Sequence, residues 1–73
     1  MKYFTFPLHI TADSWLQFYR RPAAMVVATA VDGRRVKFSA KHLQPFITHD
    51  GVRGTFVLTI DGQNDFVSLT EVR

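Results

Sequence analysis

Six basic side chains in the middle of the chain are the residues whose types and spacing point most directly to chemistry. They share a positively charged or protonatable head group, and they are Arg34, Arg35, Lys37, Lys41, His42 and Arg53. Flexible cations recognise phosphate when they gather near exposed backbone donors, whereas base recognition also requires exposed aromatic rings. Most rings fall on predicted core faces, and Tyr3 and Phe66 are the best candidates for exposure. The pattern matches no RNA-recognition, helix-turn-helix or K-homology signature, so the nature of an anionic partner stays open.

The histidines and serines form no recognisable catalytic or metal-binding pattern. His9, His42 and His49 lack the spacing of a helical metal site, and a chain without cysteine would need carboxylates from distant loops to hold zinc. His49 precedes Asp50, but neighbouring strand residues point to opposite faces, so we expect Asp50 to accept N–H groups of its own turn. Neither a glycine-rich phosphate loop nor a glycine elbow around a serine is present. We therefore expect no enzyme activity, no catalytic residue, no cofactor, no metal and no small-molecule substrate.

Length and composition limit the chain to one small domain, residues 1–73. Its 73 residues are 47% hydrophobic and 21% charged, which is too little chain for two cores. Seven Phe, two Tyr and one Trp supply large apolar surfaces, while disulfides are excluded because there is no Cys. The aromatic core must therefore stabilise the fold alone, or together with a partner subunit.

The net charge of +3 is unevenly distributed along the sequence. Residues 20–53 contain seven basic and two acidic residues, whereas residues 54–73 contain one basic and three acidic residues. A basic middle and an acidic end can attract an anionic partner or bring two copies together head to tail. Ordinary solvated faces explain the same distribution and are the simpler interpretation.

We expect no signal peptide in the first ten residues, since they have no unbroken apolar region and no small-residue cleavage site. No run approaches the roughly 20 apolar residues that a membrane span requires. We therefore expect a cytoplasmic protein with no membrane partner.

Alternation and turn signals predict the elements of the first third. Phe4, Phe6, Leu8 and Ile10 alternate with more polar residues, which indicates a half-buried strand, and Pro7 places that strand at a sheet edge. Thr11 is expected to cap a helix from Ala12 to Arg20, which Pro22 ends. The face of this helix predicted to be buried consists of Ala12, Trp15, Leu16 and Tyr19.

Residues 24–40 predict a β-hairpin around Asp32-Gly33, a dipeptide typical of a two-residue type I′ turn. With that turn, the core face consists of Met25, Val27, Thr29, Val36, Phe38 and Ala40. The opposite, basic face consists of Val26, Ala28, Ala30, Arg35, Lys37 and Ser39. The hairpin is thus expected to have one buried and one cationic side.

The second half predicts one helical turn and further strands. Lys41 to Gln44 suggests the turn, with Leu43 and Phe46 directed inward. Asp50-Gly51 separates an arm at 46–49 from a strand at 52–60, and Asp61-Gly62 precedes a last strand at 66–72. The predicted fold is α+β, in the order β-α-β-β-β-β-β. One short helix packs on a twisted antiparallel meander that can curl toward a small barrel.

Four short runs also carry a family resemblance. They are Asp32-Gly33-Arg34-Arg35-Val36, Leu43-Gln44-Pro45-Phe46, Thr48-His49-Asp50-Gly51 and Gly54-Thr55-Phe56. With the aromatic first strand, they make the chain similar to a family of short bacterial proteins known as a domain of unknown function. The likeness covers nearly the whole chain. It implies a bacterial, stand-alone, cytoplasmic protein, with no activity, cofactor or catalytic residue to transfer.

Two functional hypotheses follow. The first is a non-catalytic interaction module that docks on an unidentified protein or forms a homo-oligomer, with edge strands available for pairing. The alternative is weak, salt-sensitive nucleic-acid binding through the six basic residues, with Arg20 and Arg21 as outer contacts.

Overall fold

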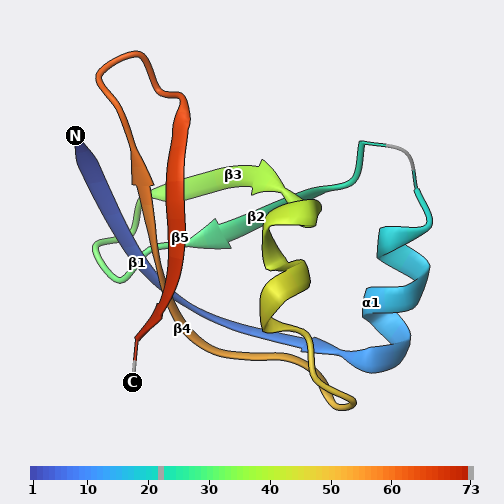
Figure 1. The fold of residues 1–73 in the computed structure, drawn as a ribbon. Coiled ribbons are helices and arrows are strands. Elements are labelled where there is room, and N and C mark those ends of the chain that lie inside the picture. Colours follow the sequence, from blue (N-terminus) through green and yellow to red (C-terminus); the bar gives the residue numbers. More distant parts are fainter. Residues whose placement is uncertain (22, 73) are drawn as a thin grey trace.

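The computed structural model describes residues 1–21 and 23–72, without the side chains of residues 18 and 19. Within this part, the elements are β1 (Lys2–Thr11), α1 (Ala12–Tyr19), β2 (Met25–Thr29), β3 (Arg35–Ser39), the 3-10 helix η1 (Ala40–Phe46), β4 (Gly51–Ile60) and β5 (Phe66–Val72) (Figure 1). The α+β class and the predicted succession of strands around one short helix are confirmed. The predicted arm at 46–49 forms an isolated β-bridge between Thr48 and Gly51.

The strands form two antiparallel sheets. One sheet has the order β1-β4-β5 and the other consists of β2 and β3. Figure 1 shows the β2–β3 hairpin crossing the longer strands of the first sheet. A backbone hydrogen bond links the two sheets, in which the Val31 N–H donates to the Thr5 carbonyl oxygen at 2.8 Å. β1 is an edge strand of its sheet, as Pro7 predicts.

The core lies between the facing sides of the two sheets and contains a row of aromatic rings. Phe6 is fully buried, and its ring centroid lies 5.6 Å from that of Phe38 in β3 and 6.3 Å from that of Phe56 in β4. Phe46 of η1 meets Phe56 edge-on at 5.2 Å. Rings at these separations and tilts gain favourable quadrupole interactions in addition to area burial. The ring contacts therefore join both sheets and η1 into one core.

The register of the β2–β3 hairpin differs from the prediction by one residue. Ala28 lies opposite Val36, and Val27 lies opposite Lys37. The cause is the loop, which closes with the Ala30 N–H donating to the Arg34 carbonyl oxygen at 2.7 Å. The loop therefore has three residues and not two, and Gly33, at a φ of +92°, is its last residue.

This register exchanges the two faces of β2. Val26, Ala28 and Ala30 are buried, whereas Met25 and Val27 point outward, so the predicted core face of β2 was wrong. The faces of β3 are as predicted, with Val36 and Phe38 in the core. Because alanine has only a methyl group, the two buried alanines allow the hairpin to approach the aromatic row closely.

The helix α1 begins as predicted. The Thr11 hydroxyl oxygen accepts the Ser14 N–H at 3.2 Å, which caps the helix. Trp15 is buried, but Leu16 is 54% exposed, so the expectation that Leu16 joins the core was wrong. The eight-residue helix packs mainly on β4 and β1, and one narrow stripe of its surface is enough for that contact. Pro22 and the side chain of Tyr19 lie outside the described part.

The turn glycine Gly51 is required by a close approach of two chain segments. It has a φ of +102°, and a Cβ atom at this position would overlap the Ile10 carbonyl oxygen. This contact brings the start of β4 against the end of β1, next to α1.

The Asp61-Gly62 turn forms as predicted, with the Asp61 carboxylate accepting the N–H groups of Gln63 and Asp65 at 2.8 and 3.0 Å.

Neighbouring positions in α1 provide a direct test of the core. Trp15→Ala should lower the free energy of unfolding by about 3–5 kcal/mol, because it removes a buried ring and leaves a cavity. Leu16→Ala, the matched control, should lower it by less than about 0.5 kcal/mol, since that side chain is largely in solvent. Urea unfolding followed by circular dichroism measures both. Equal losses for the two variants would contradict the packing of α1.

Candidate binding surface

The outer side of the β2–β3 hairpin combines apolar and cationic side chains. We define the hairpin face by the five outward-facing residues Met25, Val27, Thr29, Arg35 and Lys37. Val27 is 61% exposed and lies directly opposite Lys37, and Met25 is 41% exposed. The strand pairing places the cations of β3 beside the apolar side chains of β2. None of the five residues is acidic.

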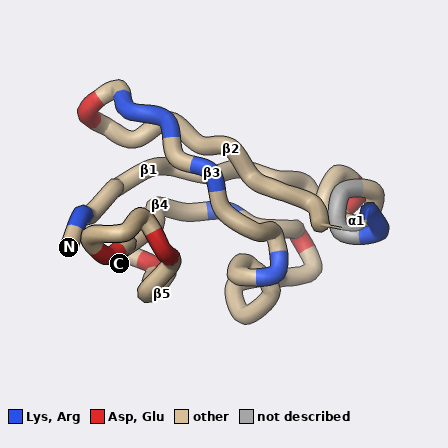
Figure 2. Tube along the Cα trace, turned by 90° about the horizontal axis from the view of Figure 1, so that it is seen from above, with Lys and Arg blue, Asp and Glu red and all other residues tan. Residues whose placement is uncertain are grey.

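The structure brings some of the six predicted site residues together and separates others. Arg35 and Lys37 share the hairpin face, and Figure 2 shows the basic positions following β3 from the hairpin tip toward η1, which carries Lys41. Arg53 lies on β4 opposite His9 of β1, in the other sheet. Arg20 and Arg21 follow α1, and Arg21 lines a cleft together with Met25 and Lys41 at the end of the hairpin opposite its tip. The compact part of the predicted set is thus Arg35, Lys37 and Lys41.

Arg34 is engaged within the molecule. Its Nε atom donates to the Asp32 carboxylate at 2.7 Å, and its guanidinium lies 4.5 Å from the centroid of the Phe4 ring. The Arg34 backbone N–H also donates to Asp32, at 3.0 Å, and this bond, followed by the guanidinium bond, lowers the pKa of the Asp32 carboxyl. Arg34 therefore covers a core ring and has its charge balanced locally.

His42 packs against an aromatic ring. Its imidazole is stacked on Phe66, with ring centroids 3.7 Å apart and an interplanar angle of 5°. Partial burial, and secondarily the charge of Lys41, lower the pKa of His42. Since the protonated form is disfavoured, His42 joins η1 to β5 as a neutral aromatic group.

Among the side chains that the structure describes, the exposed rings of Tyr3 and Phe66 lie away from the hairpin face. Phe66 is 38% exposed and Tyr3 is 62% exposed, as predicted for both. Phe66 belongs to β5 and has one side covered by His42, while Tyr3 belongs to β1 in the three-stranded sheet. The hairpin face therefore offers cations and aliphatic groups, but no ring on which a base can stack.

The His49–Asp50 pair belongs to an exposed turn. The His49 Nε2 atom lies 3.5 Å from the Asp50 carboxylate, and the two side chains are 92% and 78% exposed. In this turn the Thr48 hydroxyl oxygen accepts the Asp50 N–H at 3.2 Å, and the expected role of the Asp50 carboxylate as an acceptor stays a prediction. Both residues are central in the turn, where strand alternation does not apply. Within residues 1–21 and 23–72, no three His, Asp or Glu side chains gather as a metal site would require.

A shallow cleft of 270 Å³ connects the hairpin face with the end of the larger sheet. It lies between Arg35 and Lys37 on one side and Leu58 and Ile60 on the other, with Phe4 also contributing. The cleft and the exposure of Val27 and Met25 were missed by the sequence reasoning, because both depend on the hairpin register. The signal in the sequence was Asp32-Gly33, which fits a three-residue loop as well as the two-residue turn that was predicted.

These features define a small α+β domain of two antiparallel sheets with a mixed apolar and basic hairpin face. The chain belongs to the family described as protein of unknown function (DUF2835), whose family model matches residues 2–72. The resemblance to a domain of unknown function is thereby confirmed. Comparison with curated proteins and with solved structures finds no match. Among the described residues, no helix has the length and apolar character needed to cross a membrane.

The stacked histidine makes stability sensitive to pH. The pKa of His42 should lie below 6.5 in the folded protein, so its stabilising contribution is fully present above pH 6.5 and is lost as the pH falls through the folded pKa. Phe66→Ala should raise this pKa by exposing the imidazole, and Lys41→Gln should raise it less. NMR titration of the His42 ring proton measures each value. A His42 pKa at or above 6.5, or one unchanged by Phe66→Ala, would contradict the stacked arrangement.

Proposed function

We propose that this chain is a bacterial, cytoplasmic interaction module without catalytic activity, which docks through the hairpin face on an acidic surface of another protein. The observation that carries the proposal is the 61% exposure of Val27, at the centre of a strand and directly opposite Lys37. Covering exposed aliphatic groups with a partner removes apolar area from water, which stabilises a complex. The family resemblance supports the bacterial setting.

The arrangement of the hairpin face suits a protein partner. Protein interfaces combine an apolar centre with a polar rim, and Val27 and Met25 lie beside Arg35 and Lys37 in this way. Lys41 extends the cationic side. Charge complementarity steers association, so the matching surface is expected to be acidic and to contain apolar side chains.

The docking proposal is tested with two outward-facing strand positions of equal exposure. Val27→Glu introduces a charge into the hairpin face, and Tyr3→Glu, at 62% exposure on β1, is the matched control. Proteins captured from the host lysate by the wild type should be retained by Tyr3→Glu and lost by Val27→Glu. Hydrogen exchange of the purified complex should show protection in β2 and β3. A partner that binds both variants equally, or that protects another surface, contradicts docking through this face.

Self-association is the other form that an interaction module can take. Light scattering over a concentration series distinguishes the two. A dimer that Val27→Glu dissociates would make a second copy the occupant of the hairpin face. A strict monomer removes self-association and leaves docking on another protein.

Weak nucleic-acid binding is the second candidate, favoured by the line of cations on β3 and η1. Arg35, Lys37 and Lys41 would contact phosphates, so the affinity should depend little on base sequence. Three contacts predict a log–log salt slope of about −2 to −3, depending on whether the strand is single or double. His42 contributes no charge in its neutral form, and Arg34 and Arg53 lie outside the line.

Titration of labelled single- and double-stranded oligonucleotides at two salt concentrations tests this second candidate. Arg35→Glu/Lys37→Glu should abolish binding, whereas Arg53→Glu, a charge reversal in the other sheet, should have a small effect. If both variants weaken binding equally, or if no binding occurs at low salt, the nucleic-acid hypothesis fails.

A further inference from the structure

The free edge of β5 is open to strand pairing. In the sheet order β1-β4-β5, both β1 and β5 are edge strands. The β1 edge contains Pro7 and accepts the Val31 N–H at Thr5, so it is interrupted and partly covered. The seven residues Phe66–Val72 contain no proline, lysine or arginine, which are the residues that commonly protect an edge.

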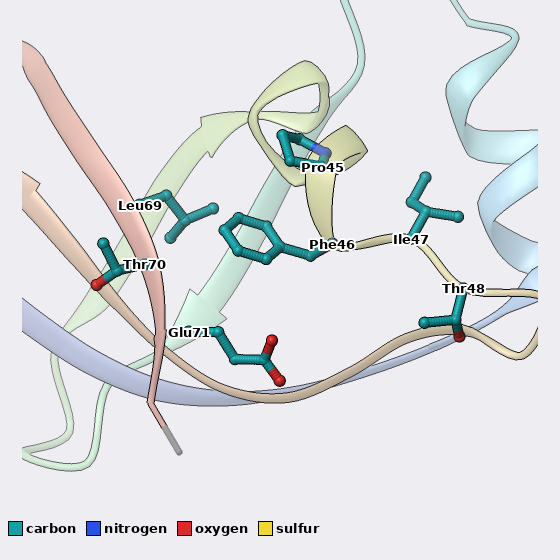
Figure 3. Close-up of a pocket in the computed structure, with 7 residues that line it drawn as sticks. All are labelled: Pro45, Phe46, Ile47, Thr48, Leu69, Thr70 and Glu71. Atoms are coloured by element: carbon teal, nitrogen blue, oxygen red, sulfur yellow. The ribbon is translucent and has the colours of Figure 1, made fainter.

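A hollow of 550 Å³ lies beside β5, between this strand and the segment of residues 45–48 (Figure 3). Leu69 and Glu71 point from β5 toward the Phe46 ring, and Thr70 points away from it (Figure 3). The register explains this direction, since Leu69 lies opposite Leu58 and Glu71 opposite Phe56, both of which are buried. Glu71 therefore projects from the apolar face of the sheet.

Among the described residues, the carboxylate of Glu71 has space but no counterion. A Cβ atom at Gly54 would lie 3.0 Å from its Oε2 atom, so the glycine makes room for the carboxylate beside the Phe56 ring. Within the described residues, the ion pairs are Arg34–Asp32 and His49–Asp50, and neither involves Glu71. Glu71 is exposed, so its carboxylate is accessible to a cation of a partner, whose aliphatic stem can pack on the neighbouring apolar side chains.

We propose that the free edge of β5 and this hollow bind an extended segment of a partner protein that carries an arginine or lysine. The backbone of the segment adds to β5 as a further strand. Its basic side chain enters the hollow, where the aliphatic part packs between Leu69 and Phe46 and the head group pairs with Glu71. This site is separate from the hairpin face, and neither depends on the other.

An inward-pointing charge on an edge strand can also serve only to prevent pairing. The two roles of Glu71 give opposite results on neutralisation. If Glu71 only guards the edge, Glu71→Gln strengthens the addition of any strand. If Glu71 binds a cation, the same substitution weakens the addition of a basic strand.

The probe for this test is a blocked synthetic peptide, acetyl-Thr-Val-Arg-Val-Thr-amide, compared with the same peptide containing citrulline, which has nearly the shape of arginine without its charge. In titrations of the ¹⁵N-labelled protein, the arginine peptide should shift the amide signals of Phe46, Ile47 and Thr48 and of residues 69–71. Its affinity should fall about tenfold with citrulline or with Glu71→Gln, the effect of losing one charge-assisted bond.

The last experiment reverses the charge at residue 71 and in the peptide. Glu71→Arg should lose the arginine peptide and gain the corresponding glutamate peptide, and an unchanged melting temperature shows that the variant folds. Any one of four results would overturn the proposal. These are equal affinity for the arginine and citrulline peptides, tighter binding by Glu71→Gln, signal shifts confined to the hairpin face, and no signal shift at millimolar peptide. Loss of docking in Val27→Glu leaves this result unaffected, so the two proposals fail separately.

Discussion

The packing of Phe6 between Phe38 and Phe56 is the interaction on which the rest of the structure depends. The three rings come from β1, β3 and β4, and their centroids lie 5.6 and 6.3 Å apart. A chain of 73 residues without cysteine has no disulfide between its sheets, and the shared aromatic contacts hold them together. Phe46 adds η1 to the same group, at 5.2 Å from Phe56. Four elements are therefore held through one set of rings, and each surface feature is fixed relative to that set.

The closeness of the hairpin to these rings determines what its outer side presents. Ala28 and Ala30 occupy the inner side of the hairpin, where larger side chains would increase the distance from Phe6. Because strand residues alternate, Met25 and Val27 lie outside when Val26 and Ala28 lie inside. The apolar character of the hairpin face is thus a consequence of the core packing. The cations of β3 are outside for the same reason, since Val36 and Phe38 are needed within.

Local signals in the sequence were sufficient for most of the fold. The alternation of β1, the Thr11 cap and the Asp61 turn each depend on neighbouring residues, and each was predicted. The hairpin register was not, because Asp32-Gly33 fits both a two-residue and a three-residue loop, and one residue exchanges the faces of β2. The hollow at Glu71 was missed for a different reason. It depends on the pairing of β5 with β4 and on the position of residues 45–48, which no local pattern determines.

The two candidate surfaces have opposite charge, and both follow from the small size of the domain. Each sheet has one face in the single core, so the β2–β3 hairpin must leave its other face in solvent, and with it Arg35 and Lys37. The seven residues of η1 cover the larger sheet incompletely, which leaves the hollow beside β5 with Glu71 in it. A larger domain would cover these positions with further elements. In this chain the same shortage of covering elements leaves a cationic face and an anionic hollow at separate places, so the two partners proposed for them would not compete.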